Sequence, residues 1–197
     1  MQYSELQVTS NFSFLRGGSH PEELVYEATR LNYKAIAITD RNTVAGVVRA
    51  FKVAKAENSS KNKDEKIQFI PACRLCLPDG PDLLAYPTDI TAWGRLCAVL
   101  SKGNLRTEKG KCELYKQDVF ENAEGIKFIV VPPETLNSRL DFDADFKQNV
   151  KEYKAALGNE LYIAANFLYN GSDEKRLYRI SQSGVPMIAT NEVHYHE

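Results

Sequence analysis

The sequence predicts an α/β fold in which the strands of a mostly parallel sheet alternate with helices. Two observations support this. Short apolar runs recur along the 197 residues, and stretches with the apolar spacing of an amphipathic helix lie between them. A parallel sheet is covered on both faces, so its strands appear as continuous apolar runs. The pattern fits an open doubly wound sheet or a barrel, and in either case ligands bind at the carboxyl ends of the strands.

About seven strands are expected, because each run is short, apolar and bounded by turn residues. The runs occupy residues 5–9, 35–39, 67–71, 82–86, 127–131, 160–165 and 186–190.

Five helices are expected between these strands. Ser19 and Glu22 have the spacing of a capping box at the start of the first helix, and Pro21 fits its first turn. The other four are expected at residues 43–57, 89–101, 143–157 and 173–183. The last two end just before Gly158 and Gly184, where a glycine commonly terminates a helix.

Composition limits the class of protein. Lys and Arg number 25 against 26 Asp and Glu, so the net charge of −1 gives no whole-chain attraction to nucleic acid. A mean hydropathy of −0.39 and the lack of a long apolar run exclude a membrane span. No secretory signal is visible at the N-terminus. A cytoplasmic location is the expectation that follows from cysteines taken as reduced thiols.

Three further segments carry possible chemistry. Cys73 and Cys76 have C-x-x-C spacing, but no second pair accompanies them, so all four cysteines are expected to be reduced structural thiols. The lysine-rich stretch 101–118 is expected to be a basic surface insertion, with contact to nucleic acid as the alternative. The polar stretch 55–66 is expected to be a solvated loop.

Residues just after the strands are the candidates for a functional site. Asp40, Glu192 and His194 are weak candidates for metal ligands, because a hydrolytic metal site needs several His and carboxylate side chains together. The chain has only three histidines. Asp40 has an alternative role, which is to accept backbone hydrogen bonds and shape a turn. His20 is expected at a helix end rather than in a metal site.

Three stretches together resemble a known family. "ELQVTSNFSFLRGGSHPEELV", "AIAITDRNTVAGVVRA" and "MIATNEVHYHE" are similar, in this order, to the N-terminal polymerase-and-histidinol-phosphatase (PHP) domain of bacterial C-family DNA polymerases, most of all to the error-prone alpha-subunit branch. The resemblance implies a distorted (β/α)7 TIM-like barrel. It implies a single domain over residues 1–197, truncated at its C-terminus and forming the front piece of a much longer polymerase.

Active members of that family hold a cluster of metal ions and hydrolyse phosphoesters, and in some replicative polymerases this gives a proofreading exonuclease. The resemblance places different residues at most of the ligand positions of this chain. Asp40, Glu192 and His194 remain possible ligands, whereas the other positions hold Gln7, Thr9, Arg16, Arg41 and Arg74. Arginine is always charged and cannot bind a cation. We therefore expect the arginines to pair with Asp40 and Glu192.

The resemblance implies a non-catalytic structural module of an error-prone DNA polymerase, which synthesises DNA during repair of damage. The parent would use Mg²⁺ and catalytic residues outside this chain, whereas no cofactor is expected in the module. The expected partners are the rest of the polymerase chain, DNA through the parent, and repair or replication proteins, with no membrane. The alternative is a metal-dependent phosphoesterase or 3′–5′ exonuclease that uses Zn²⁺ or Mn²⁺ at a reduced site.

Overall fold

The computed structural model describes residues 3–62 and 65–196, and this part of the chain has an α/β fold with six α-helices and eight strands. Two compact units make up the chain. The first extends to Arg74 and includes the segment from Thr190 onward, and the second spans Leu75–Ala189. The expected α/β class is therefore confirmed, whereas the assignment of all 197 residues to a single domain stays a prediction.

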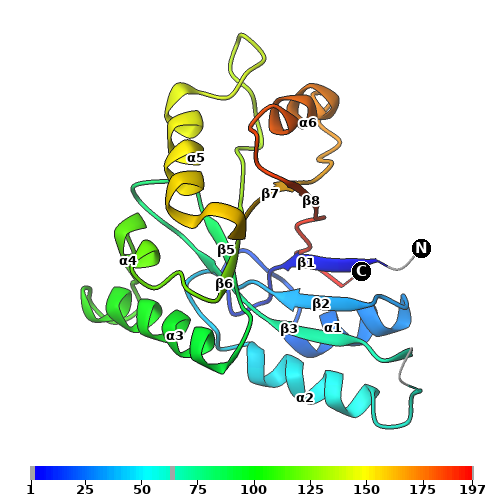
Figure 1. Cartoon of the computed structure of the whole chain (residues 1–197). Helices are drawn as coiled ribbons and strands as arrows, with labels where there is room; N and C mark the ends of the chain where they lie inside the picture. Colours follow the sequence, from blue (N-terminus) through cyan, green and yellow to red (C-terminus); the bar gives the residue numbers. More distant parts are fainter. Residues whose placement is uncertain (1–2, 63–64, 197) are drawn as a thin grey trace. The chain divides into compact units, whose positions relative to one another are not determined.

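The first unit contains a parallel sheet of β1 (Ser4–Val8), β2 (Ala35–Ile38) and β3 (Gln68–Pro71), hydrogen-bonded in that order (Figure 1). Its strands coincide with three of the predicted runs. A further short strand, β4 (Cys73–Leu75), lies where the chain passes from one unit to the next. The sequence did not predict β4 as a separate strand, because it continues the same apolar run after Ala72.

Helices α1 (Pro21–Arg30) and α2 (Val47–Glu57) pack against each other and against this sheet (Figure 1). The core between them is closed by side chains that are at most 3% exposed, among them Val8, Ile36, Ile38, Leu24, Val25, Ala50 and Ala54. Because side chains alternate along a strand, Ala37 and Thr39 point to the opposite face of β2. The candidates Asp40 and Arg41 follow the end of that strand.

The predicted capping box at α1 is displaced by one residue. The helix is capped by His20, whose backbone N–H donates to Glu23 Oε2 at 2.7 Å. The hydroxyl of Ser19 instead lies 2.7 Å from Nδ1 of His196 and accepts a hydrogen bond from its backbone N–H. The placement of His20 at a helix end is thus confirmed, and the Ser19–Glu22 box is wrong. The expected loop 55–66 falls partly outside the described residues, and its first three positions belong to α2.

The second unit contains β5 (Leu83–Pro87), β6 (Ile126–Val130), β7 (Leu161–Ala165) and β8 (Met187–Ala189), paired in that order. The pairs β6–β7 and β7–β8 are parallel, as expected, but β5 and β6 are antiparallel. An apolar run carries no information on strand direction, which explains the difference. Strand pairing within the described residues forms two sheets and does not close a barrel.

The helices of the second unit match the predictions apart from one addition. They are α3 (Ile90–Leu105), α4 (Lys116–Phe120), α5 (Ala144–Leu157), which a 3₁₀ turn η2 (Gly158–Glu160) follows, and α6 (Asp173–Ser181). Gly158 and Gly184 follow α5 and α6 with φ angles of 57° and 69°. These left-handed conformations favour glycine, and Gly158 ends α5 as expected, whereas α6 already ends at Ser181, before Gly184. The unpredicted helix, α4, begins within the insertion 101–118.

Basic residues of the insertion pair with carboxylates, among them Asp118, which lies in the insertion itself and is 2% exposed. The Asp118 carboxylate accepts a hydrogen bond from Arg106 Nη2 at 2.7 Å and lies 2.6 Å from Lys102 Nζ. Lys116 Nζ lies 2.6 Å from Glu152. Several of the basic residues therefore already have acidic partners within the unit. Contact of this insertion with nucleic acid stays a prediction.

Within the described residues, every helix is too short or too polar to cross a bilayer.

Candidate functional site

The first unit gathers most of the predicted site residues at the carboxyl ends of its strands. Val8 pairs in parallel with Val193, and Arg41 pairs in the same way with Arg74. Backbone hydrogen bonds fix both contacts: Thr9 N–H donates to Val193 O at 2.8 Å, and Arg74 N–H donates to Asp40 O at 2.9 Å. The segment that carries Glu192 and His194 therefore runs beside β1, although almost the whole sequence separates them.

Asp40 is the most constrained of the candidates. It is 1% exposed. Its Oδ1 accepts hydrogen bonds from Ser10 N–H at 2.8 Å and from Ser13 Oγ at 2.7 Å, and its Oδ2 accepts one from Ser10 Oγ at 2.6 Å. Ser13 Oγ in turn accepts a hydrogen bond from Arg41 N–H at 2.9 Å. Asp40 therefore holds the turn that follows β1 through serine donors, which replace the arginine partner expected from the sequence.

Glu192 has the arginine partner that was expected of it. Arg74 Nη1 donates to Glu192 Oε1 at 2.9 Å, and the two side chains are 14% and 15% exposed. Glu192 has a φ angle of 52°, which is uncommon for a residue other than glycine. The carboxylate of Glu192, the acidic candidate in the segment "NEVHYHE", thus faces the permanently charged guanidinium of Arg74.

Two buried polar residues on β1 were not predicted to act at the site in the way that the structure shows. Gln7 is 1% exposed, and its Oε1 accepts a hydrogen bond from Thr190 Oγ1 at 2.9 Å. Glu5, equally buried, accepts hydrogen bonds from Tyr3 OH at 2.7 Å and from the backbone N–H of Asn191. Burial raises the pKa of Glu5 above its ordinary value. Both side chains fasten the segment after Thr190 to β1.

The remaining candidates take different positions around this site. Arg16 is exposed, on the loop that follows β1. His194 is half-buried, and its backbone carbonyl accepts a hydrogen bond from Gly18 N–H at 3.0 Å. Thr9 is buried. The serine donors could have been suspected from "TSNFS", since Ser10 and Ser13 flank the strand end, but nothing local indicates their partner.

These residues do not fit a metal ion. The two oxygens of Asp40 already accept three hydrogen bonds, so an ion would have to displace donors there, and Glu192 faces a guanidinium. Over residues 3–62 and 65–196, no three His, Cys, Asp or Glu side chains form a group suited to a metal. The cysteines of the C-x-x-C pair carry reduced thiols, and Cys73 Sγ lies 3.3 Å from Asp40 O.

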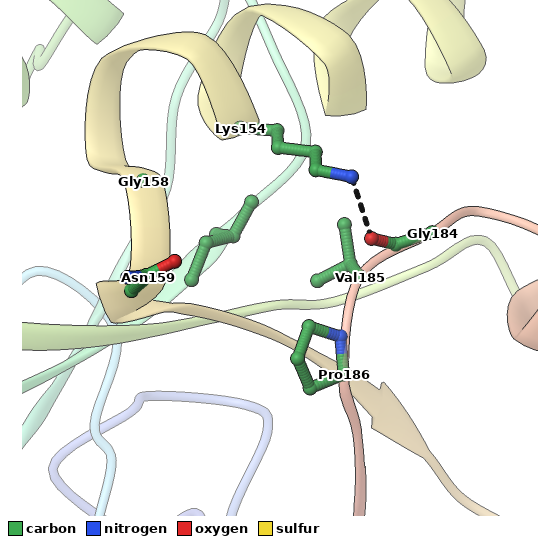
Figure 2. A pocket seen from close by; sticks show the side chains of 7 residues that line it. Lys154, Gly158, Asn159, Gly184, Val185 and Pro186 are labelled. Atoms are coloured by element: carbon green, nitrogen blue, oxygen red, sulfur yellow. Dashed lines mark hydrogen bonds between the residues drawn. The ribbon is translucent and has the colours of Figure 1, made fainter.

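A separate hollow lies in the second unit between the end of α5 and the start of β8 (Figure 2). Its volume is ≈ 450 Å³, and its lining includes Lys154, Asn159, Leu161 and Val185. The Lys154 ammonium donates to Gly184 O at 2.7 Å (Figure 2). The lining carries no nucleophile with a neighbouring base, so the hollow offers no constellation for catalysis.

Comparison with known proteins adds three findings. Residues 5–168 match the family model described as PHP domain. The error-prone DNA polymerase of Caulobacter vibrioides is 43% identical over 98% of this chain, and that of Rhodopseudomonas palustris (strain BisB5) is 40% identical over the same share. The chain spans only 17% of the length of either relative.

Among solved structures, an amidohydrolase from Chromobacterium violaceum, with bound sulfate and no metal, has a TM-score of 0.67 at 13% identity, covering 98% of this chain and 87% of its own. Histidinol phosphate phosphatase from Lactococcus lactis, complexed with zinc, histidinol and phosphate, has a TM-score of 0.54 at 11% identity, covering 100% and 88%. At such low identity these likenesses support the fold alone.

Proposed function

This chain belongs to the PHP domain family, and from that premise we propose that it is a structural module of an error-prone DNA polymerase. In this proposal the module has no catalytic activity of its own. The chain is homologous to the N-terminal part of polymerases with that name. The parent would transfer nucleotides to a DNA primer with Mg²⁺ during damage repair in the cytoplasm. Its partners would be DNA and repair or replication proteins, and this module would contact the rest of the polymerase chain.

The observation that carries the proposal is that Asp40 is buried and already accepts three hydrogen bonds. Hydrolysis of a phosphoester by a metal enzyme needs an ion with an open position, where water is activated. Asp40 is the acidic residue retained in the motif after β2, and it directs both oxygens to Ser10 and Ser13. To bind an ion it would have to give up hydrogen bonds that hold the turn after β1.

Arg74 supports the same proposal from the other side of the site. A guanidinium is a permanent cation, and it repels a divalent ion nearby. Its pairing with Glu192 removes a second acidic residue from the set available to a metal. These contacts instead connect separate segments of the first unit. Asp40 joins the end of β2 to the loop after β1, and Glu192 joins the segment after Thr190 to β4.

The alternative function is a metal-dependent phosphoesterase or 3′–5′ exonuclease with a reduced site. One observation favours it, namely the likeness of the fold to a phosphatase that was solved with zinc. His194 would then be the key ligand, with Asp40 and Glu192 rearranged around Zn²⁺ or Mn²⁺. We favour the structural module because this rearrangement has to break both the serine network and the Arg74–Glu192 pair.

The test is a hydrolysis assay on the 197-residue chain with Mn²⁺ or Zn²⁺ added. The substrates are bis(p-nitrophenyl) phosphate and a 3′-labelled single-stranded DNA, and the matched variants are His194→Ala and Glu192→Gln. The proposal predicts the same background release from all three proteins. Metal-dependent release by the wild type that is lost in His194→Ala would establish the alternative. Primer extension by the longer polymerase that carries this chain tests the parent activity separately.

A further inference from the structure

The loop after β1 exposes large apolar side chains while its base is firmly held. Phe14 is 85% exposed and Leu15 is 86% exposed, and Phe12 beside them is 37% exposed. We call residues 12–15 the apolar loop. Adjacent apolar side chains presented together on a surface are typical of an interaction site. We propose that the apolar loop inserts Phe14 and Leu15 into an apolar pocket on the remainder of the polymerase chain.

The serine network anchors this loop from below. Ser13, at its centre, donates its hydroxyl to Asp40 and accepts a hydrogen bond from Arg41 N–H. The backbone N–H of Ser13 donates to Ser10 O at 3.0 Å, and Arg16 N–H donates to Ser13 O at 2.9 Å. Phe14 and Leu15 therefore project from a turn that the core of the unit fixes, which lowers the entropy cost of docking.

Two backbone features show that the loop holds one particular shape. A Cβ atom on Gly17 would lie 2.3 Å from Ser10 O and 2.5 Å from Thr9 O, so only glycine allows the loop to close this tightly against the end of β1. Leu15 has a φ angle of 60°, which is unfavourable for a branched apolar side chain. Strain of this kind persists where the surroundings impose it, and it is common at binding surfaces.

The occupant is inferred from size and connectivity, and this step rests on the proposed function. The curated relatives contain about six times the length of this chain, so most of such a polymerase lies outside it. Two side chains offer far less than the ~800 Å² per partner of a stable complex between separate proteins. A domain of the same polypeptide needs a smaller contact, because the covalent link supplies a high effective concentration. Arg16 follows the loop and is exposed, so the pocket should have an acidic rim.

Hydroxyl-radical footprinting measures side-chain exposure directly and tests this inference. Oxidation rates of Phe14 and Leu15 are compared between the 197-residue chain and the longer polymerase that carries it. Tyr169 is the internal control, because it is 88% exposed and also has a positive φ, of 56°. We expect the rates at Phe14 and Leu15 to fall at least several-fold in the longer protein. Equal rates in the two proteins, or a fall only after another protein is added, would overturn the inference.

A pair of variants supplies the second readout. Phe14→Ser with Leu15→Ser should lower the Tm of the longer polymerase by about 3 °C or more and leave the Tm of the 197-residue chain unchanged. Tyr169→Ser should leave both unchanged. An equal decrease in the Tm of the longer polymerase for the double serine variant and for Tyr169→Ser, or no decrease for either, would contradict docking by the apolar loop. Primer extension separates the two proposals. If Phe14 is protected but the longer protein does not extend a primer, the docking proposal stands and the proposed polymerase function is wrong.

Discussion

Arg74 Nη1 donates to Glu192 Oε1 across 2.9 Å, and 118 positions of sequence separate the two residues. The pair joins β4 to the segment after Thr190, beside the carboxyl end of β1. From the sequence resemblance we propose that both positions correspond to metal ligands in active members of the family. This ion pair joins segments of the first unit that are distant in sequence, and in our proposal it also withdraws a carboxylate from metal binding.

Breaking this pair should destabilise the chain. Arg74→Met removes the guanidinium from a mostly buried carboxylate, and Glu192→Gln removes the carboxylate charge beside the Arg74 guanidinium. We expect each to cost about 1–3 kcal/mol in the free energy of unfolding, measured by urea denaturation. The double variant should cost clearly less than the sum. Additive costs would show that the two side chains do not interact in solution.

Removing the serine donors should affect Asp40 in a similar way. Ser13→Ala deletes one hydroxyl donor to the buried carboxylate and one acceptor for Arg41 N–H. We expect a loss of about 1–3 kcal/mol. The matched control is Ser59→Ala, since Ser59 is exposed and its hydroxyl donates to the nearby Ala56 O. Equal unfolding midpoints for the two variants would mean that the Asp40 network contributes nothing.

Asp118 in the insertion 101–118 should make the free energy of unfolding depend on pH in the acidic range. Hydrogen bonds from Arg106, then from Lys102, hold the pKa of Asp118 well below its ordinary range. A carboxyl group whose pKa is lowered on folding stabilises the native state above its unfolded pKa of about 3.9, and this contribution is lost as the pH falls further. The wild type should exceed Asp118→Asn by about 1–3 kcal/mol at pH 7, and the difference should shrink below about pH 4. A difference that is constant with pH would contradict this assignment.

Glu5 should act in the opposite direction. Burial raises its pKa above the ordinary value, so the folded chain binds this proton more tightly than the unfolded chain. Stability from this group is therefore greatest at low pH and decreases as the pH rises from about 4.5 through the folded pKa. In unfolding measurements from pH 4 to pH 7, Glu5→Gln should gain stability relative to the wild type as the pH increases. A relative loss over that range would show that the pKa of Glu5 is lowered instead.

Much of the fold could be predicted from the sequence because apolar periodicity is local. The run "AIAI" gives β2, and the spacing of Leu24, Val25 and Ala28 gives α1. The capping box was misplaced by one residue because Ser19–Glu22 and His20–Glu23 have the same spacing, and only the second is used. The antiparallel pairing of β5 with β6 was missed because strand direction depends on the path of the connecting segment.

The sequence predicted where the candidate residues of the site lie, but not which side chains Asp40 contacts. Strand ends indicated Asp40 and Glu192, and the chemistry of arginine favoured an ion pair, which formed between Arg74 and Glu192. The partners of Asp40 are Ser10 and Ser13, which precede it by 30 and 27 residues. No local pattern links side chains over such distances. The exposure of Arg16 likewise depends on the turn that the two serines hold.

The central claim, that the former ligand set no longer holds a metal, is tested most directly by the metal content of the 197-residue chain. The purified chain is dialysed against trace Zn²⁺ and Mn²⁺ and analysed by elemental mass spectrometry. A variant that combines Gln7→His, Thr9→His, Arg41→His and Arg74→Glu serves as a comparison with restored ligand types. We predict no stoichiometric metal in the wild type. Stoichiometric metal in the wild type that is lost in His194→Ala would contradict the account and make the site a candidate enzyme centre.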